Sequence, residues 1–428
     1  MKPIGDPFAV VKRSDNPERD YLYTPSVLCL KSGRILVSLD ISDQRGEIHA
    51  SDDGGNTWAL KGVGDFIHAR LFADGDTVYL IGRLKAGSLA IYVSKDNGET
   101  WSGPSLLADG KWHQSACGVH YKNGYIYLVM EYLKKGEAEY FPWWGVHILA
   151  PVVLRGKLGT DLTQKENWLF SEKVSFREMA PDESQLDWFG VPFFNTVLQY
   201  PPDELHTASA KEYQQAFDYE NNKEGMTLSS QPFGWLETNI VEIVDPKHYW
   251  YDATGKTLHL FMRSFTGGSG YCCVAKAVES CVDGKDVIRI EPVTNPSGKK
   301  VLFLPMPGGQ MKFYVKFDEK TKLYWLLSTQ ATDTMCRVEQ LGEERFNLPY
   351  DERERLVLHF SKNMVDWVFA GLVSKGDSPK QSRHYASMDI DGDDLVIASR
   401  SGDAQCQSAH NGNLITFHRV KNFRELIY

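Results

Sequence analysis

Two eight-residue stretches, SDDGGNTW at residues 51–58 and SKDNGETW at residues 94–101, share the pattern S-x-D-x-G-x-T-W. Their separation falls in the range of roughly 40–50 residues that one blade of a β-propeller occupies. The aspartate side chain binds nearby backbone N–H groups, glycine accepts positive φ, and tryptophan packs between neighbouring sheets. Each stretch, an Asp-box, is therefore predicted to close the turn between two outer strands and to carry no chemistry.

Alternating apolar runs and turn residues predict a series of hairpins around these boxes. A shortened copy of the box occupies residues 361–367, and a remnant surrounds Asn167 and Trp168. Runs of apolar residues separated by Gly-, Asp- or Asn-containing turns predict paired strands. The pairs are 26–30 with 35–39, 69–72 with 78–81, 117–121 with 126–130, 240–244 with 258–262, 312–317 with 324–327, and 386–390 with 395–399.

These hairpins predict an all-β chain, a β-propeller of four-stranded antiparallel blades formed by one domain over residues 1–428. The early strand at 8–12 is expected to pair with the last blade and close the ring, which leaves few exposed sheet edges. The hairpins give six blades. The irregular stretch at 175–234 is either an insertion or a seventh, degenerate blade.

The composition narrows the classes of partner. The formal net charge of −9 argues against nucleic acid, whose binding depends on neutralised phosphates. The sequence has no run of about 18 apolar residues, so it predicts no membrane span. Residues 1–6 lack the apolar core of a secretory leader, so we expect a cytoplasmic protein, or a periplasmic or secreted one if a leader has been removed. We expect a monomer. The seven cysteines match no zinc motif and are expected to be buried apolar groups.

Candidate site residues follow from propeller geometry, because the inner strands converge on a central channel and the first residues of these strands face it. Histidines recur at three predicted blade starts, which predicts an axial cluster of imidazoles. Arg263 and Arg400 each end an apolar strand and either reach solvent or face a pocket. Tyrosine and tryptophan at 140–144 form either a flat sugar-binding loop or ordinary packing. The expected binding residues are His68, Asn239, Lys312, Trp143 and Arg400.

The Asp-boxes resemble those of the sialidase-like propellers. Over the rest of the chain the sequence is more similar to another group of propellers. This group contains ulvan lyases and the lyases or α-L-rhamnosidases that act on rhamnosyl-glucuronate. The resembling segments are 113–116, 122–127, 149–151, 161–162, 167–168, 234–239, 307–313, 391–394 and 409–419. The resemblance covers most of the chain and favours seven blades. It implies that His113 is catalytic, assisted by Arg263. The catalytic tyrosine of the group is either Tyr251 or Tyr385.

The resemblance favours a polysaccharide lyase that cleaves beside a uronic acid by β-elimination, at a rhamnose–glucuronate linkage. Such an enzyme must neutralise a carboxylate, which arginine, histidine and asparagine can do, and must move protons, which histidine and tyrosine can do. The expected catalytic set is His113, Arg263, His384 and Tyr385. The expected partner is an oligo- or polysaccharide.

The sequence leaves two other functions open. A glycoside hydrolase needs two carboxylates in most families, for which Asp182, Glu183, Asp187 and Glu237 are available, or a single histidine, for which His49 is a candidate. A sialidase is disfavoured because Tyr23-Thr24-Pro25 replaces the expected Phe-Arg-Ile-Pro and no clear arginine triad is visible. The other alternative is a propeller that binds glycans without cleaving them.

No cofactor is required by any of these functions. A structural Ca²⁺ or Zn²⁺ near His410, Asn411 and Cys406 is the alternative to a hydrogen-bonded turn there.

Overall fold

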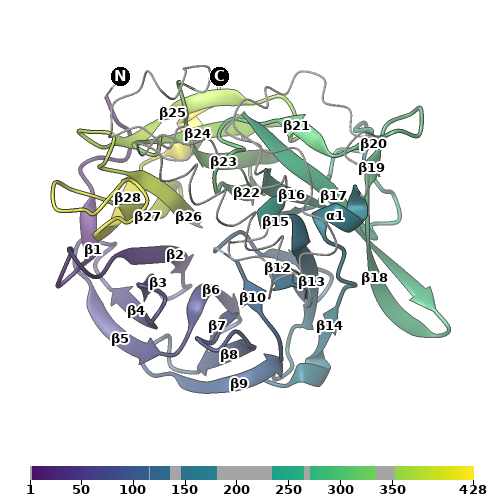
Figure 1. Cartoon of the computed structure of the whole chain (residues 1–428), viewed down its shortest axis with the longest axis horizontal. Helices are drawn as coiled ribbons and strands as arrows, with labels where there is room; N and C mark the ends of the chain where they lie inside the picture. Colours follow the sequence, from purple (N-terminus) through teal and green to yellow (C-terminus); the bar gives the residue numbers. More distant parts are fainter. Residues whose placement is uncertain (1, 115, 135–145, 181–233, 265–269, 334–351) are drawn as a thin grey trace, which may run out of the picture.

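The computed structural model describes residues 2–114, 116–134, 146–180, 234–264, 270–333 and 352–428. These residues form a ring of six antiparallel sheets around a central axis (Figure 1). Each sheet is one blade, and its strands follow the chain from the axis outward, except that the N-terminal strand forms the outer edge of the last blade.

The first three blades come from the N-terminal part of the chain. Blade 1 contains β2 (Leu22–Cys29), β3 (Ile35–Ile41), β4 (Arg45–Ser51) and β5 (Ala59–Gly64). Blade 2 contains β6 (Ile67–Asp74), β7 (Thr77–Arg83), β8 (Leu89–Ser94) and β9 (Ser102–Ala108). Blade 3 contains β10 (Trp112–His113) and β11 (His120–Lys122), which both pair with β12 (Tyr125–Leu133), then β13 (Leu149–Lys157) and β14 (Trp168–Phe170).

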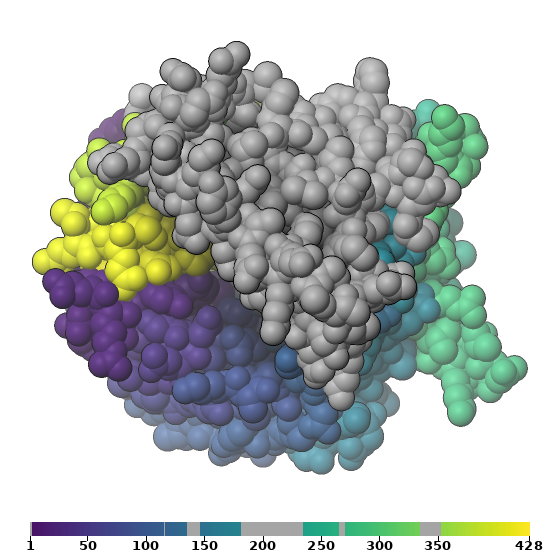
Figure 2. Space-filling model, viewed as in Figure 1, coloured from purple at the N-terminus to yellow at the C-terminus, as the bar shows by residue number. Residues whose placement is uncertain are grey.

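The other three blades complete the ring. Blade 4 contains β15 (Trp235–Val241), β16 (Thr257–Ser264), β17 (Tyr271–Val282) and β18 (Lys285–Glu291), with β21 (Phe303–Pro305) also paired to β17. Blade 5 contains β22 (Tyr314–Asp318), β23 (Leu323–Thr329), β24 (Arg355–Ser361) and β25 (Val368–Lys375). Blade 6 contains β26 (Arg383–Asp391), β27 (Asp394–Ser401), β28 (Leu414–Val420) and the N-terminal β1 (Ala9–Arg13). The hairpin of β17 and β18 projects from the edge of the ring (Figures 1 and 2).

The ring closes as the sequence predicted, because β1 pairs with β28 and supplies the outermost strand of blade 6. The inner strand β2 then contacts both β6 and β26, so that the first blade lies between the second and the sixth. The number of blades is six, as the hairpins indicated, and the seventh blade favoured by the resemblance is wrong for the ring that the structure describes. Of residues 175–234, the described part includes one short helix, α1 (Phe176–Met179), which packs Phe176 against Trp235.

Six apolar cores fill the spaces between adjacent blades. The core between blades 1 and 6, for example, combines Val37 and Leu39 of β3 with Ile415 and Phe417 of β28. Because each blade is covered on both faces, its second strand is largely buried on both faces, as in β3, where all seven residues are buried. The inner strands are therefore held by packing on both sides.

The Asp-boxes have the predicted structure. In the first box, Asp53 Oδ1 accepts hydrogen bonds from the backbone N–H groups of Asn56 and Thr57 at 3.0 and 2.9 Å. Hydrogen bonds from Thr57 are the main reason that the pKa of Asp53 is lowered to about 2. Trp58 packs on Phe417 of the neighbouring blade with ring centroids 5.3 Å apart. In the shortened copy of the box at residues 361–367, Met364 occupies the position of the glycine and has a φ of 63°.

Two glycines give a matched test of this packing. Gly55 has a φ of +98°, and a Cβ there would lie 2.1 Å from the Phe417 ring, whereas Gly33, with a φ of +89°, has no atom within 4 Å of its Cβ position. Gly33→Ala is expected to lower the free energy of unfolding by about 1–2 kcal/mol through backbone strain alone. Gly55→Ala adds overpacking and is expected to lower it by about a further 1–3 kcal/mol. Equal losses in chemical denaturation would show that the box does not fix the contact between the blades.

Candidate active site

Four inner strands carry the same irregularity near their first residues. In β2, β6, β15 and β26 the register with the second strand shifts, so that the ladder is interrupted by a β-bulge. Such a bulge redirects a side chain and is common beside active sites. The first bulged residue has positive φ in each case, with values of 36° for Thr24, 54° for His68, 60° for Glu237 and 48° for Tyr385. Non-glycine residues rarely adopt this conformation, which points to a functional constraint at these positions.

The second strands of these four blades place a charged residue beside each bulge. In every blade the residue before the bulge pairs across the ladder with a charged partner: Asp40, Arg83, Arg263 and Arg400. All four blades therefore direct polar groups from equivalent positions to one end of the channel. The sequence identified Arg263 and Arg400 by their position after an apolar strand, and Arg83 follows the same rule but was missed.

Tyr385, Arg263 and Glu237 form the centre of this cluster. The Tyr385 hydroxyl lies 2.7 Å from Nη1 of Arg263, and Oε2 of Glu237 lies 3.5 Å from the same nitrogen. Arg263 Nε donates to the Gln310 carbonyl at 2.9 Å, which fixes the guanidinium plane. All three side chains are buried. Burial raises the pKa of Tyr385 to about 12, so the phenol is protonated at neutral pH until a partner accepts its proton.

Two more arginines lie against the same tyrosine. The guanidinium carbons of Arg400 and Arg353 are 4.9 and 5.9 Å from the centroid of the Tyr385 ring. Arg400 also stacks on Tyr23 at 3.7 Å, and its Nε and Nη1 have no hydrogen-bond partner among the described residues. Three arginines therefore surround Tyr385, although the sequence showed no clear arginine triad. Their guanidinium groups have the chemistry that binds a negatively charged group.

The predicted histidines are at the axis as well. The rings of His68 and His113 lie 4.6 Å apart, and His113 Nδ1 lies 2.8 Å from Oε2 of the buried Glu131. Burial lowers the pKa of His113 and raises that of Glu131, so the pair is held without net charge at neutral pH. The sequence missed Glu131, which lies opposite His113 in the ladder between β10 and β12.

His384 lies beside the tyrosine, at the position before the bulge. Its Nδ1 is 3.3 Å from Nη1 of Arg353, and its Nε2 has no partner within the described ranges. Burial and the charge of Arg400 lower the pKa of His384 well below its ordinary value. Tyr251, the alternative to Tyr385, lies 39% exposed between β15 and β16, beyond the end of β15 opposite to Glu237. Tyr385 is therefore the tyrosine of this site.

The other predicted residues that the structure describes are not part of the cluster around Tyr385. Asn239 and Lys312 lie deeper in the channel, where both bind the backbone of the next blade. His49 is buried in the third strand of blade 1, where its Nε2 lies 2.9 Å from Oε2 of Glu47, and it is not part of the cluster. Trp143, Asp182, Glu183 and Asp187 lie outside the described residues.

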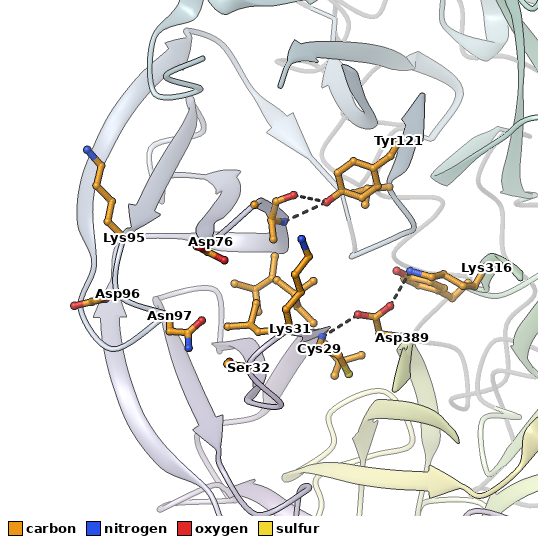
Figure 3. Close-up of a pocket in the computed structure, with 18 residues that line it drawn as sticks. Cys29, Lys31, Ser32, Asp76, Lys95, Asp96, Asn97, Tyr121, Lys316 and Asp389 are labelled. Atoms are coloured by element: carbon orange, nitrogen blue, oxygen red, sulfur yellow. Dashed lines mark hydrogen bonds and ion pairs between the residues drawn. The ribbon is translucent and has the colours of Figure 1, made fainter. Parts of the chain in front are cut away.

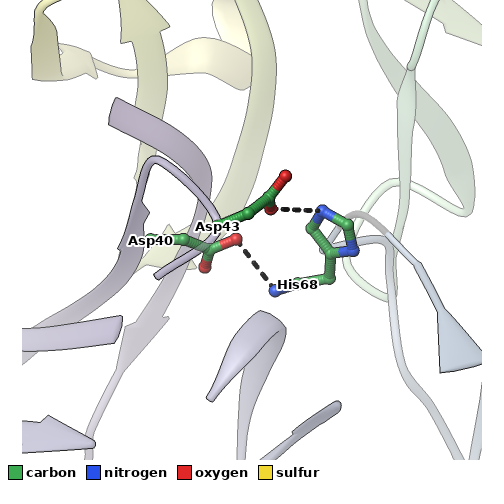
Figure 4. Close-up of side chains that lie close together, drawn as sticks. All are labelled: Asp40, Asp43 and His68. Atoms are coloured by element: carbon green, nitrogen blue, oxygen red, sulfur yellow. Dashed lines mark hydrogen bonds and ion pairs between the residues drawn. The ribbon is translucent and has the colours of Figure 1, made fainter. Parts of the chain in front are cut away.

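Within the described part of the chain, one group of side chains has the composition of a metal site: Asp40, Asp43 and His68 (Figure 4). The guanidinium of Arg83 lies 3.5 Å from Oδ1 of Asp43 and 3.4 Å from Nδ1 of His68. A cation already balances this group, so the donor set does not fit a metal ion. His410 is hydrogen-bonded to Asn411 and Tyr23, and Cys406 donates to the Lys380 carbonyl, which are contacts of the kind expected for a hydrogen-bonded turn.

The raised pKa of the Asp40 carboxyl group predicts that the stability of the protein depends on pH. Its Oδ2 accepts hydrogen bonds from Thr24 and from the backbone N–H of His68 at 2.9 Å, but burial outweighs them and raises the pKa to about 7. Between about pH 4 and 7 the folded state keeps a proton that the unfolded state releases. The contribution of Asp40 to the free energy of unfolding therefore falls as pH rises through this range and no longer changes above it.

Asp40→Asn imitates the protonated side chain and is expected to remove this fall. From pH 5 to 7 the wild type is expected to lose about 2–3 kcal/mol more than the variant does. Urea unfolding at both pH values measures the difference, with Asp15→Asn on the surface as the control. Parallel curves for the wild type and Asp40→Asn would mean that Asp40 is ionised throughout.

Comparison with known proteins supports the fold. No protein-family model matches the sequence, and no curated protein matches it. The structure is similar to the α-L-arabinanase of Penicillium chrysogenum complexed with arabinobiose, with a TM-score of 0.50, 11% sequence identity, and coverage of 98% of this chain and 99% of that one. It is also similar to a Dyadobacter fermentans protein of unknown function, with a TM-score of 0.50, 12% identity, and coverage of 97% and 98%.

A Hadza microbial sialidase matches with a TM-score of 0.49 and 14% identity over 94% of this chain and 66% of that one. At this level of sequence identity the comparisons show only the fold, a β-propeller like that of the arabinanase. They do not show which reaction the protein catalyses. Among the described residues, no helix is long and apolar enough to cross a bilayer.

Proposed function

We propose that this protein is a glycoside hydrolase that removes a carboxylate-bearing sugar from an oligo- or polysaccharide, with Tyr385 as the nucleophile. The observation that carries the proposal is the buried contact of the Tyr385 hydroxyl with Arg263, which also binds Glu237. Some glycosidases, the sialidases among them, use a tyrosine in place of the second carboxylate. A neutral nucleophile suits an anionic substrate, because a carboxylate nucleophile would repel it.

The three arginines define the substrate class. Arg263, Arg353 and Arg400 all lie around Tyr385, and Arg400 keeps two N–H-bearing nitrogens without a partner among the described residues, in a fully buried position. A buried guanidinium with unpaired donors is unfavourable until an anion binds it. A carboxylate bound there would lie next to the atom that attacks, which favours a sugar whose carboxylate is close to the anomeric carbon.

The reaction then follows from the positions of the carboxylates. Tyr385 attacks the anomeric carbon and loses its proton to Glu237, whose charge acts on the phenol. The bond to the leaving oxygen breaks, and this oxygen takes a proton from an acid across the site. We assign this role to Asp43, whose Oδ1 lies 3.5 Å from Nε2 of His68 and whose side chain is 42% exposed, so that it can take up the required proton from solvent. Water then cleaves the tyrosyl glycoside, returns a proton to Asp43, and Glu237 gives its proton back to Tyr385.

A second candidate is β-elimination at a uronic acid, favoured by the His113–Glu131 pair beside the arginines. The lowered pKa of His113 weighs against it, since a weak base abstracts a C–H proton poorly. The arabinanase of the same fold binds arabinobiose, which fits a saccharide substrate for either reaction.

A panel of glycans and aryl glycosides separates these functions. The panel includes uronic acids, sialic acid and related keto-sugar acids, with neutral arabinosides and rhamnosides as controls. A hydrolase releases reducing sugar from a carboxylate-bearing substrate without new near-ultraviolet absorbance, whereas a lyase produces that absorbance. Cleavage of the neutral glycosides alone would contradict the role of the three arginines, and binding without cleavage would contradict an enzyme.

A further inference from the structure

A layer of six polar side chains lies deeper in the channel, one from each blade. We name this layer the axial ring: Ser26, Arg70, Gln114, Asn239, Lys312 and Ser387. In four blades the member is the residue at which the ladder resumes after the bulge, so these positions are structurally equivalent. All six side chains are buried.

Each member binds the backbone of the next blade. The serines and Asn239 accept hydrogen bonds from backbone N–H groups, at 3.0 Å from Leu71 to Ser26, 3.0 Å from Val27 to Ser387 and 2.9 Å from Val315 to Asn239. The other members donate to carbonyls, at 2.7 Å from Arg70 to Val129 and 3.3 Å from Gln114 to Thr238, while Lys312 donates to Ala386. The ring thus joins all six inner strands.

The charge of the ring is not balanced from within. Arg70 and Lys312 are cationic and no member is acidic, and Nε and Nη1 of Arg70 have no hydrogen-bond partner in the described part of the chain. The carboxyl groups near these cations, Glu131 and Glu237, bind His113 and Arg263 in the cluster around Tyr385 and contact neither cation in the described part of the chain. The neighbouring Cys117 keeps its proton, because burial raises the pKa of its thiol to about 12.

A cavity lies next to the axial ring, at the end of the channel opposite to Tyr385. This cavity of about 680 Å³ opens between the last residues of the inner strands (Figure 3). Its lining includes Val27 and Leu71, which directly follow two ring members, and Tyr314. The Lys312 ammonium lies 5.2 Å from the centroid of the Tyr314 ring, so Tyr314 separates the cavity from this member of the axial ring.

We propose that the axial ring binds a small monovalent anion, chloride under physiological conditions, between Arg70 and Lys312. Two buried cations that no carboxylate contacts among the described residues are unfavourable, and an ion that accepts hydrogen bonds from both satisfies the unpaired donors and balances the charge. Because the ring joins the six blades, the anion would stabilise the whole propeller. This site is separate from the catalytic cluster and does not depend on the proposed reaction.

Crystals of the full chain grown in sodium bromide test the site directly. We expect an anomalous difference peak, measured at the bromine absorption edge, between the Arg70 guanidinium and the Lys312 ammonium. Peaks confined to surface lysines, or a peak-free ring occupied by water alone, would overturn the proposal.

Thermal unfolding tests the same site in solution. At constant ionic strength, replacing sodium gluconate by sodium chloride at a concentration that saturates the site is expected to raise the Tm of the wild type by about 2 °C. Arg70→Met and Lys312→Met are each expected to abolish this increase. Lys31→Met, at the rim of the same cavity, is the control and is expected to keep it. An equal chloride effect in the wild type and in a folded ring variant would overturn the proposal; if one variant fails to fold, the other and the bromide crystals decide.

Discussion

Tyr385→Phe is expected to lower kcat on the best carboxylate-bearing glycoside by about 10³-fold or more, because it removes the attacking oxygen and nothing else. The phenyl ring of the variant would keep the packing of the phenol on Arg400 and Arg353. We therefore expect the substrate to bind the variant with a Kd close to the KM of the wild type. Release of the aryl group measures turnover, and calorimetric titration measures binding.

Tyr314→Phe is the matched control for this change. Tyr314 is also a buried tyrosine of an inner strand, but it lines the cavity at the opposite end of the channel. Its variant is expected to retain full turnover. If Tyr385→Phe kept more than about a tenth of the wild-type kcat, tyrosine would not be the nucleophile, and a role for His113 in β-elimination would gain support.

The fold was largely predictable because its signals are local. An Asp-box places its hydrogen-bonding side chains, its glycine and its tryptophan within eight residues, so Asp53 and Trp58 adopt the same geometry wherever the chain carries them. The hairpins are local in the same way. The blade number is not, because closure depends on the angle between blades over the whole ring. The resemblance to a seven-bladed group therefore misled where the direct count of hairpins did not.

The site was only partly predictable, since its decisive contacts join distant parts of the chain. The Tyr385 hydroxyl contacts Arg263, which lies 122 residues earlier in the sequence, and Arg353 lies in the chain just before β24. The bulge that directs Glu237 to the axis leaves no signature in composition. A register argument would have helped: Arg83, Arg263 and Arg400 each lie at or near the end of the second strand of a blade, and aligning these ends would also have placed Asp40.

Asn239 and Lys312 illustrate a second reason. Both were predicted as ligand-binding residues because they lie near blade starts, and both face the channel. The structure shows the polar atoms of Asn239 bound to the backbone at Phe313 and Val315, so this side chain holds two blades together. Position along an inner strand therefore decides the role of a side chain: those on the bulge face the candidate site, and those after the bulge join the blades.

Arg263→Met is expected to have the second large effect, this time on stability. The change leaves Glu237, a buried carboxylate, without its guanidinium partner, and removing one partner of a buried ion pair costs about 3–5 kcal/mol. Glu237→Gln should cost less, since Arg263 would still bind the Gln310 carbonyl and the Tyr385 hydroxyl. Urea denaturation followed by tryptophan fluorescence measures both.

The double variant, Arg263→Met with Glu237→Gln, separates charge from shape. If the cost of Arg263→Met arises from an unpaired charge, neutralising Glu237 should recover part of it, so that the double variant is more stable than Arg263→Met alone. Arg34→Met is the control, because Arg34 binds Asp52 and Glu99 on the outside of the ring, where such pairs contribute about 0–1 kcal/mol. Equal losses for Arg34→Met and Arg263→Met, with no recovery in the double variant, would mean that Glu237 is neutral and cannot accept the Tyr385 proton.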